Sequence, residues 1–119
     1  MNTVASEFKE DWILLGPLDV LAAIRMTARE FWYTIAVHGS LSRDLDLIAV
    51  PWAEVVDATP EELVAAVVKA LDMPCLVDGP EEKPHGRKAW SIRMPKHRWY
   101  VDLSVMPPTR TTHDVAREA

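Results

Sequence analysis

Two apolar runs separated by a Gly-Ser pair constrain the fold of this chain more than any other feature. Residues 32–38 are rich in aromatic and β-branched side chains, and residues 44–50 form a second apolar run that ends before a proline. Gly39, between the two runs, permits a tight reversal of the backbone. We therefore predict two antiparallel strands joined as a hairpin, with Gly39 and Ser40 at its tip.

Two aspartates in the second strand are the first indication of a site. Asp44 and Asp46 are two residues apart, and side chains in a strand alternate between its faces. Both carboxylates therefore lie on one face, while Leu45 and Leu47 point to the core. Like charges held side by side repel, and a divalent cation between them would relieve that repulsion. The alternative is a solvated face at the edge of a sheet, where acidic side chains discourage aggregation.

Two helices are predicted, one before and one after this hairpin. Apolar residues recur at helical spacing over residues 17–30, and Pro17 suits the first turn. The second helix begins after Thr59. A proline follows Thr59 directly, and Glu62 lies three residues after it, which is typical of a helix start. This helix should end by Met73, because another proline follows.

A second hairpin is predicted near the end of the chain, after an exposed loop over residues 78–86 that is rich in proline, glycine and acids. Its strands are residues 90–94 and 99–105, joined by a two-residue turn at Lys96 and His97. This register pairs Ile92 with Val101, Arg93 with Tyr100 and Ser91 with Asp102. Asp102 then points away from the core. A diagonal ion pair with Arg93 is the alternative role for its charge.

Length and composition predict one folded domain over residues 1–106 and a tail over residues 107–119. A chain of 119 residues, 49% of them hydrophobic, can bury a core without disulfides. The tail is rich in proline, threonine and charge, which favours disorder or loose packing. The expected fold class is α+β, a small mixed sheet of about four strands with two main helices on one face. Most of the five tryptophans are expected to fill the core.

Charge and residue usage exclude several classes of protein. A net charge of −5 leaves no global basic field for nucleic acid or an acidic membrane. One cysteine excludes an internal disulfide, and no apolar stretch is long enough for a signal peptide or a membrane span, so we expect a cytoplasmic protein. The four histidines lack zinc-like spacing, and glycine-rich Walker or dinucleotide signatures are absent.

The order of these features resembles the nucleotidyltransferase superfamily that includes DNA polymerase beta, in particular its minimal single-domain members from bacteria and phages. The resemblance rests on a Gly-Ser turn after a strand at Gly39 and Ser40, an Asp-Leu-Asp on the next strand at Asp44 and Asp46, and a third aspartate, Asp102, in a later hairpin strand. The helix ahead of the first strand also fits the family's order of elements.

The resemblance implies a Mg²⁺-dependent or Mn²⁺-dependent enzyme. It would transfer a nucleoside monophosphate from a nucleoside triphosphate such as ATP to an acceptor hydroxyl on RNA, a protein or a small molecule. In this family three carboxylates hold two metal ions, a role that falls here to Asp44, Asp46 and Asp102. The paired ions neutralise charge on the transferred group and on the leaving pyrophosphate.

Four further residues are expected to contact the phosphates of the nucleotide. Gly39 would let backbone N–H groups approach the terminal phosphates, and the Ser40 hydroxyl would add a hydrogen bond. The guanidinium groups of Arg43, beside the turn, and of Arg93, on the face of Asp102, would meet phosphate oxygens directly.

The loop between Ser40 and Asp44 departs from the family pattern, because only three residues intervene where members usually have more. The short loop favours an alternative function, a nucleotide-sensing or protein-interaction module that has lost catalysis. No further domain follows to grip an acceptor, so a partner chain or a second copy would supply that surface. A third option is a structural protein whose acids only solvate the edge of a sheet.

Overall fold

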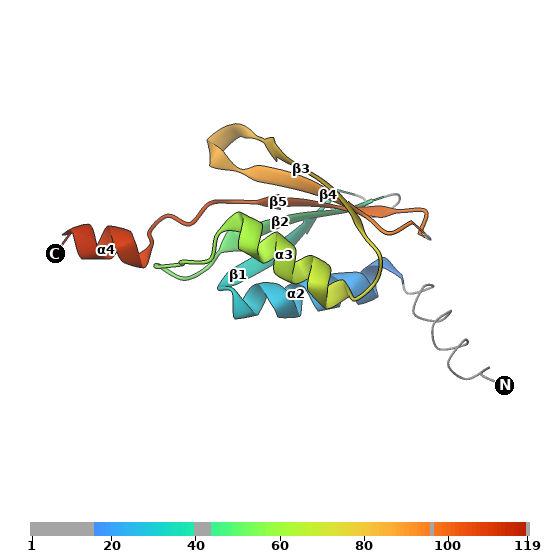
Figure 1. The fold of residues 1–119 in the computed structure, drawn as a ribbon, viewed down its shortest axis with the longest axis horizontal. Helices are drawn as coiled ribbons and strands as arrows, with labels where there is room; N and C mark the ends of the chain where they lie inside the picture. The colour runs from blue at the N-terminus through green and yellow to red at the C-terminus, as the bar shows by residue number, and fades with distance from the viewer. Residues whose placement is uncertain (1–15, 40–43, 96, 119) are drawn as a thin grey trace.

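The computed structural model describes residues 16–39, 44–95 and 97–118, and these form an α+β fold. In chain order the elements are α2 (Pro17–Glu30), β1 (Tyr33–His38), β2 (Leu45–Pro51), α3 (Pro60–Leu71), β3 (Leu76–Glu82), the short 3₁₀ helix η1 (Pro84–Gly86), β4 (Lys88–Arg93), β5 (Tyr100–Val105) and α4 (Thr112–Glu118). The five strands form one mixed sheet in the order β1-β2-β5-β4-β3. Helices α2 and α3 lie together on one face (Figure 1), and the opposite face is called the open face below.

Helix α2 has the bounds that its periodicity predicts. Pro17 occupies the first turn, where a missing N–H costs nothing, and the N–H of Gly16 donates to the Asp19 carboxylate at 3.1 Å. One side of the helix is buried, through Val20, Leu21, Ile24, Thr27 and Ala28.

Helix α3 begins with the capping box that the sequence predicts. The N–H of Glu62 donates to the Thr59 hydroxyl oxygen at 3.1 Å, and the N–H of Thr59 donates to the Glu62 carboxylate at 3.0 Å. The helix ends at Leu71, two residues before the predicted limit, because Asp72 takes a left-handed conformation with φ +49°. Its apolar stripe packs against α2 and the sheet.

The two predicted hairpins are confirmed, and they meet in the middle of the sheet. β1 pairs antiparallel with β2, and β4 pairs antiparallel with β5 in the predicted register, with Ile92 opposite Val101. The N–H of His97 donates to the Met94 carbonyl at 2.8 Å in the connection between β4 and β5. β2 and β5 are parallel neighbours, so one strand of each hairpin forms the centre of the sheet.

The prediction of an exposed loop over residues 78–86 is wrong, because β3 occupies most of that range. β3 pairs antiparallel with β4, with Val77 opposite Ile92 and a register shift between Asp78 and Glu81 at the bulge that contains Gly79. Every residue of this edge strand is exposed, so the sequence shows none of the alternation that marks a half-buried strand. The sheet therefore has five strands instead of about four.

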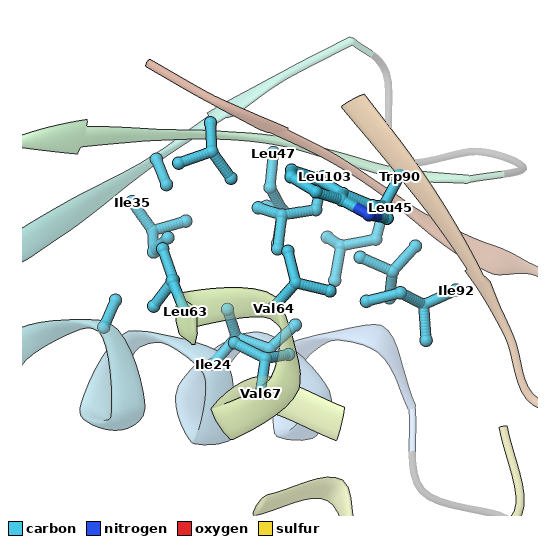
Figure 2. Packing of buried hydrophobic residues seen from close by; sticks show 14 of the residues in the cluster. Ile24, Ile35, Leu45, Leu47, Leu63, Val64, Val67, Trp90, Ile92 and Leu103 are labelled. Atoms are coloured by element: carbon cyan, nitrogen blue, oxygen red, sulfur yellow. The ribbon is translucent and has the colours of Figure 1, made fainter. Parts of the chain in front are cut away.

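The core lies between the sheet and the two helices. Figure 2 shows Ile24 of α2 and Val67 of α3 directed toward Leu45, Leu103 and Ile92 of the sheet, and all five are fully buried. The expectation for the tryptophans holds only in part. Trp90 is buried and Trp99 packs against the core. Trp32 and Trp52, however, are about half exposed, and their rings contact each other with centroids 5.0 Å apart and planes tilted by 47°.

The C-terminal segment contains a helix, α4, that the sequence analysis did not predict. The Thr111 hydroxyl accepts from the N–H of Asp114, and the Asp114 carboxylate accepts from the N–H of Thr111, which caps the first turn. The Asp57 carboxylate accepts a further bond from the N–H of Thr112 at 2.7 Å. No residue of α4 is buried.

None of the helices among the described residues combines the length and the apolar character needed to cross a bilayer.

Candidate functional site

The tip of the first hairpin holds Gly39 against Asp46. Gly39 has φ +79°, a conformation that side-chain-bearing residues rarely adopt, and a Cβ built on it would lie 2.7 Å from Asp46 Oδ2. The position therefore requires glycine for two reasons, the backbone conformation and the approach of the carboxylate. The backbone at Gly39 lies directly beside one of the predicted metal ligands.

Asp46 stands beside Asp102 in the middle of the sheet. The two residues are register partners on the parallel strands β2 and β5, which lie about 5 Å apart in an ordinary sheet. Their neighbours Leu45, Leu47 and Leu103 are fully buried against the helices. By alternation, both carboxylates project from the open face, as the sequence predicts.

A row of polar residues crosses the open face at this level, one from each strand. From edge to edge the register partners are His38, Asp46, Asp102, Ser91 and Asp78. Asp44 precedes β2 and lies two residues before Asp46, one step from the row along the strand. The fold thus brings together all three aspartates that the sequence singled out.

Burial and the charges of neighbouring aspartates both affect the pKa of Asp102. The pKa of Asp102 is raised, first by burial and then by the negative charge of Asp46, with a smaller contribution of the same sign from Asp44. Lys83 and His38 act in the opposite direction. Within the described segments, neither Asp46 nor Asp102 takes part in an ion pair or a side-chain hydrogen bond. Among the residues that the structure describes, the central pair of carboxylates therefore has no direct cationic partner.

Arg93 lies on the same face, but it does not form the alternative ion pair with Asp102. The ion pairs among the described residues are those of Lys83, Lys88 and Arg110. The guanidinium carbon of Arg93 lies 5.0 Å from the centroid of the Tyr100 ring, a cation–π contact. Arg93 is exposed, so its donors remain accessible to a ligand on the open face.

Two of the predicted phosphate contacts, Ser40 and Arg43, lie outside the described residues, and so does the loop that contains them. Among the residues that the structure does describe, no set of three or more His, Cys, Asp or Glu side chains has an arrangement that would hold a metal ion. The register brings the three aspartates to neighbouring positions, but the three do not form such a set.

Two residues at this site were not assigned a role from the sequence. Tyr100 interacts with Asp44 and carries a raised pKa, for which the charge of Asp44 is the largest cause. A signal for it existed, because Tyr100 precedes Asp102 by two residues and must share its face. The charge of Lys83, the residue directly after β3, acts to lower the pKa of Asp102. No signal pointed to Lys83, since its segment was assigned to a loop.

Comparisons of this chain with protein-family models, with curated proteins and with solved structures found no match.

Proposed function

We propose that this protein is a magnesium-dependent nucleotidyltransferase whose site lies on the open face around Asp46 and Asp102. The observation that carries the proposal is the register of the parallel strands β2 and β5. It places these two carboxylates side by side, with Asp44 one step away and the Gly39 backbone against Asp46.

The chemistry of the three side chains fits a hard divalent cation. Carboxylate oxygens are the ligands that Mg²⁺ and Mn²⁺ prefer, and magnesium is usually held by one or two carboxylates together with substrate phosphates. Burial, and after it the negative charges of Asp46 and Asp44, raise the pKa of Asp102. A bound cation would offset the repulsion between these charges. Rotation of the carboxylates about their side-chain bonds is what would turn them to a shared ion.

Each residue of this site has its own role in the proposed reaction. The hydroxyl oxygen of the acceptor forms a bond to the α-phosphorus, the bond from that phosphorus to the pyrophosphate oxygen breaks, and Asp102 accepts the hydroxyl proton. Asp44 and Asp46 would hold the metal ions, which when bound neutralise the charge of the phosphates. Backbone N–H groups at Gly39 would approach the terminal phosphates, with Ser40, Arg43 and Arg93 as side-chain contacts.

The test is calorimetric titration of ATP into the protein with and without Mg²⁺ or Mn²⁺. The wild type should bind the nucleotide only when the metal is present, and Asp46→Asn should abolish that binding. The unfolding temperature of this variant should hold or rise, because a repelled charge has been removed. Incubation with each nucleoside triphosphate labelled at the α-phosphate, with RNA and protein acceptors, should then show transfer of label by the wild type alone.

Asp78→Asn is the matched control. Asp78 stands on the same polar row, but Ser91 separates it from Asp102, and it lies on the exposed edge strand. This variant loses the same charge and should bind metal and nucleotide as the wild type does. A wild type that binds no nucleotide in the presence of either metal would overturn the proposal, and so would unchanged binding by Asp46→Asn.

The side-chain orientations favour one second candidate, a nucleotide-binding module without catalysis. Among the described residues no three potential ligands converge on a metal position, and catalysis needs that convergence more strictly than binding does. The two functions differ in the labelling experiment. Nucleotide binding that depends on Asp46, without transfer of label to any acceptor, would establish the second candidate and reject the first.

A further inference from the structure

The two edges of the sheet differ in their protection against pairing with a further strand. β3 forms one edge and β1 the other (Figure 1). β3 carries Asp78, Glu81 and Glu82, a proline and a register shift, which are features by which edge strands avoid pairing. The six residues of β1, Tyr33–His38, include no Asp, Glu, Lys, Arg or Pro, and their register with β2 is continuous. β1 is therefore the unprotected edge of this sheet.

The backbone groups that β1 directs away from the sheet belong to Tyr33, Ile35 and Val37. The N–H of Trp52 donates to the Trp32 carbonyl at 3.0 Å, one step before the first register pair of β1 and β2. Hydrogen-bonded pairs alternate along an antiparallel ladder, so every second residue counted from Trp32 bonds to β2. The residues between them direct their N–H and C=O groups outward. None of the hydrogen bonds between described residues outside the ladders uses these outward groups.

β1 is complementary to a second copy of itself. When two copies of β1 are placed antiparallel with Ile35 opposite Ile35, Tyr33 of each lies opposite Val37 of the other. Every outward N–H and C=O group of the strand then meets a partner. On the open face, Thr34 of each copy lies opposite Ala36 of the other, and both residues are exposed.

The charge of the chain favours β1 over β3 as the place where two copies meet. A net charge of −5 makes two copies repel each other, so a contact between them should avoid bringing acids together. β1 paired with itself sets no acidic side chains opposite one another. Two copies paired through β3 would bring Asp78, Glu81 and Glu82 of each copy together, and like charges opposite one another are destabilising.

Exposed apolar side chains on the elements next to β1 add to this surface. Trp32 directly precedes β1 and is 51% exposed, and Trp52 directly follows β2 and is 55% exposed. α2 packs against β1, and its Leu18 and Met26 are 68% and 70% exposed. A stable dimer typically buries about 800 Å² on each partner, so a short strand pair needs support from side chains beside it. These four side chains provide apolar area for that support.

We propose that this protein forms a two-fold homodimer in which the β1 strands of two copies pair antiparallel about Ile35 and join the two sheets into one. The inference does not depend on the proposed function. A two-fold contact uses the same surface on both copies and closes on itself. The protected β3 strands then form both outer edges of the joined sheet. The open faces of the two copies lie on the same side, with His38 of each at the end of the paired strands.

The test is sedimentation equilibrium of the full chain over a series of concentrations. We expect the wild type to reach twice the mass of one chain, which is 13.4 kDa. Thr34→Glu combined with Ala36→Glu sets acid opposite acid across the two-fold axis, and the mass should return to that of one chain. Thr34→Lys combined with Ala36→Glu sets base opposite acid and should keep the dimer. Both positions are exposed, so circular dichroism should show that both variants fold.

Leu76→Glu is the matched control at the other edge. Leu76 is 60% exposed on β3, and an acid there should leave the dimer intact. A wild type that stays a monomer would overturn the inference and would leave a strand of a different chain as the occupant of the edge. A dimer that persists in Thr34→Glu with Ala36→Glu would overturn it too. Equal dissociation of the two double variants would overturn the pairing about Ile35.

Amide hydrogen exchange tests the same pairing residue by residue. The outward N–H groups of Ile35 and Val37 should exchange more slowly as the protein concentration rises, because the second copy bonds to them. The N–H groups of Thr34 and Ala36 bond to β2 in one copy already and should change less. Exchange at Ile35 and Val37 that does not depend on concentration, in a chain that dimerises over that range, would show that another surface forms the dimer and would overturn the inference.

Discussion

The carboxylate of Asp46 lies against the α-carbon of Gly39, so close that a Cβ there would stand 2.7 Å from Oδ2. A glycine at the hairpin tip and an acid in the following strand are thus parts of one local structure. Because Gly39 has no side chain, its backbone can approach a group bound by the Asp46 carboxylate.

Gly39→Ala should therefore affect binding as well as stability. An alanine with φ +79° costs about 1–2 kcal/mol, and its Cβ would push the Asp46 carboxylate aside. Gly86→Ala is the matched control, because Gly86 has φ +75° but its Cβ would meet Pro107 instead. Urea unfolding should show a similar loss of stability for both variants. Titration with Mn²⁺ should show weaker binding for Gly39→Ala alone, and equal binding by the two would contradict this account.

The raised pKa of Asp102 predicts a pH dependence of stability. The folded protein holds the Asp102 proton more tightly than the unfolded chain does, so this group lowers stability as the pH rises from its ordinary pKa, near 4, through the raised value. Asp102→Asn removes that penalty. The variant should melt at a higher temperature than the wild type at neutral pH, and the difference should vanish below about pH 4. Thermal unfolding across this range is the measurement.

Asp57 provides a control of opposite sign. The hydrogen bonds from the side chain and the backbone of Thr112 hold the pKa of the Asp57 carboxyl below its usual range. Its stabilising contribution is present above the ordinary pKa and is lost as the pH falls. Asp57→Ala should melt at a lower temperature than the wild type at neutral pH, with a smaller difference in acid. If Asp57→Ala and Asp102→Asn shifted in the same direction at neutral pH, one of the two assignments would be wrong.

The capping box of α3 should be measurable on its own. Thr59→Ala removes the acceptor for the N–H of Glu62 and should cost about 1 kcal/mol in the free energy of unfolding. Thr109→Ala changes an exposed threonine outside the helices and strands and should cost much less. Equal losses in the two variants, measured by urea unfolding, would show that the cap does not stabilise the helix.

The hydroxyl of Tyr33 should matter for stability and for titration at high pH. It donates to the Ala58 carbonyl at 2.8 Å, so Tyr33→Phe leaves a carbonyl without its donor and should cost roughly 1 kcal/mol. Burial, followed by the charges of Glu61 and Glu62, raises the pKa of Tyr33 to about 12. The wild type should therefore lose stability as the pH rises above 10, and the variant should lose less. Tyrosinate absorbance and unfolding on one pH series test both statements.

Much of the fold could be predicted because short-range rules settle it. The Thr59 to Glu62 capping box and the Pro17 start of α2 depend on hydrogen bonds and sterics within one turn of helix. The register of the second hairpin follows from alternation together with a short connection, which pair the two strands with both apolar sets facing the core. These signals need no knowledge of the rest of the chain.

β3 could not be predicted, because its own residues carry no pattern that indicates a strand. Residues such as Asp78, Glu81 and Glu82 gave no apolar alternation, and the strand exists through its hydrogen bonds to β4. The bond from the N–H of Thr112 to Asp57 likewise joins parts of the chain that no local pattern connects. Exposed elements lack the burial signal on which sequence patterns depend.

For the candidate site, the sequence by itself determined which face each aspartate occupies, and only the tertiary structure decided that they meet. Alternation along a strand fixed the faces of Asp44, Asp46 and Asp102, because the side-chain period is a local property of extended backbone. The parallel pairing of β2 with β5 joins two separate hairpins across the centre of the sheet. It depends on burying the apolar faces of both hairpins under α2 and α3, a balance of long-range packing that no single segment contains.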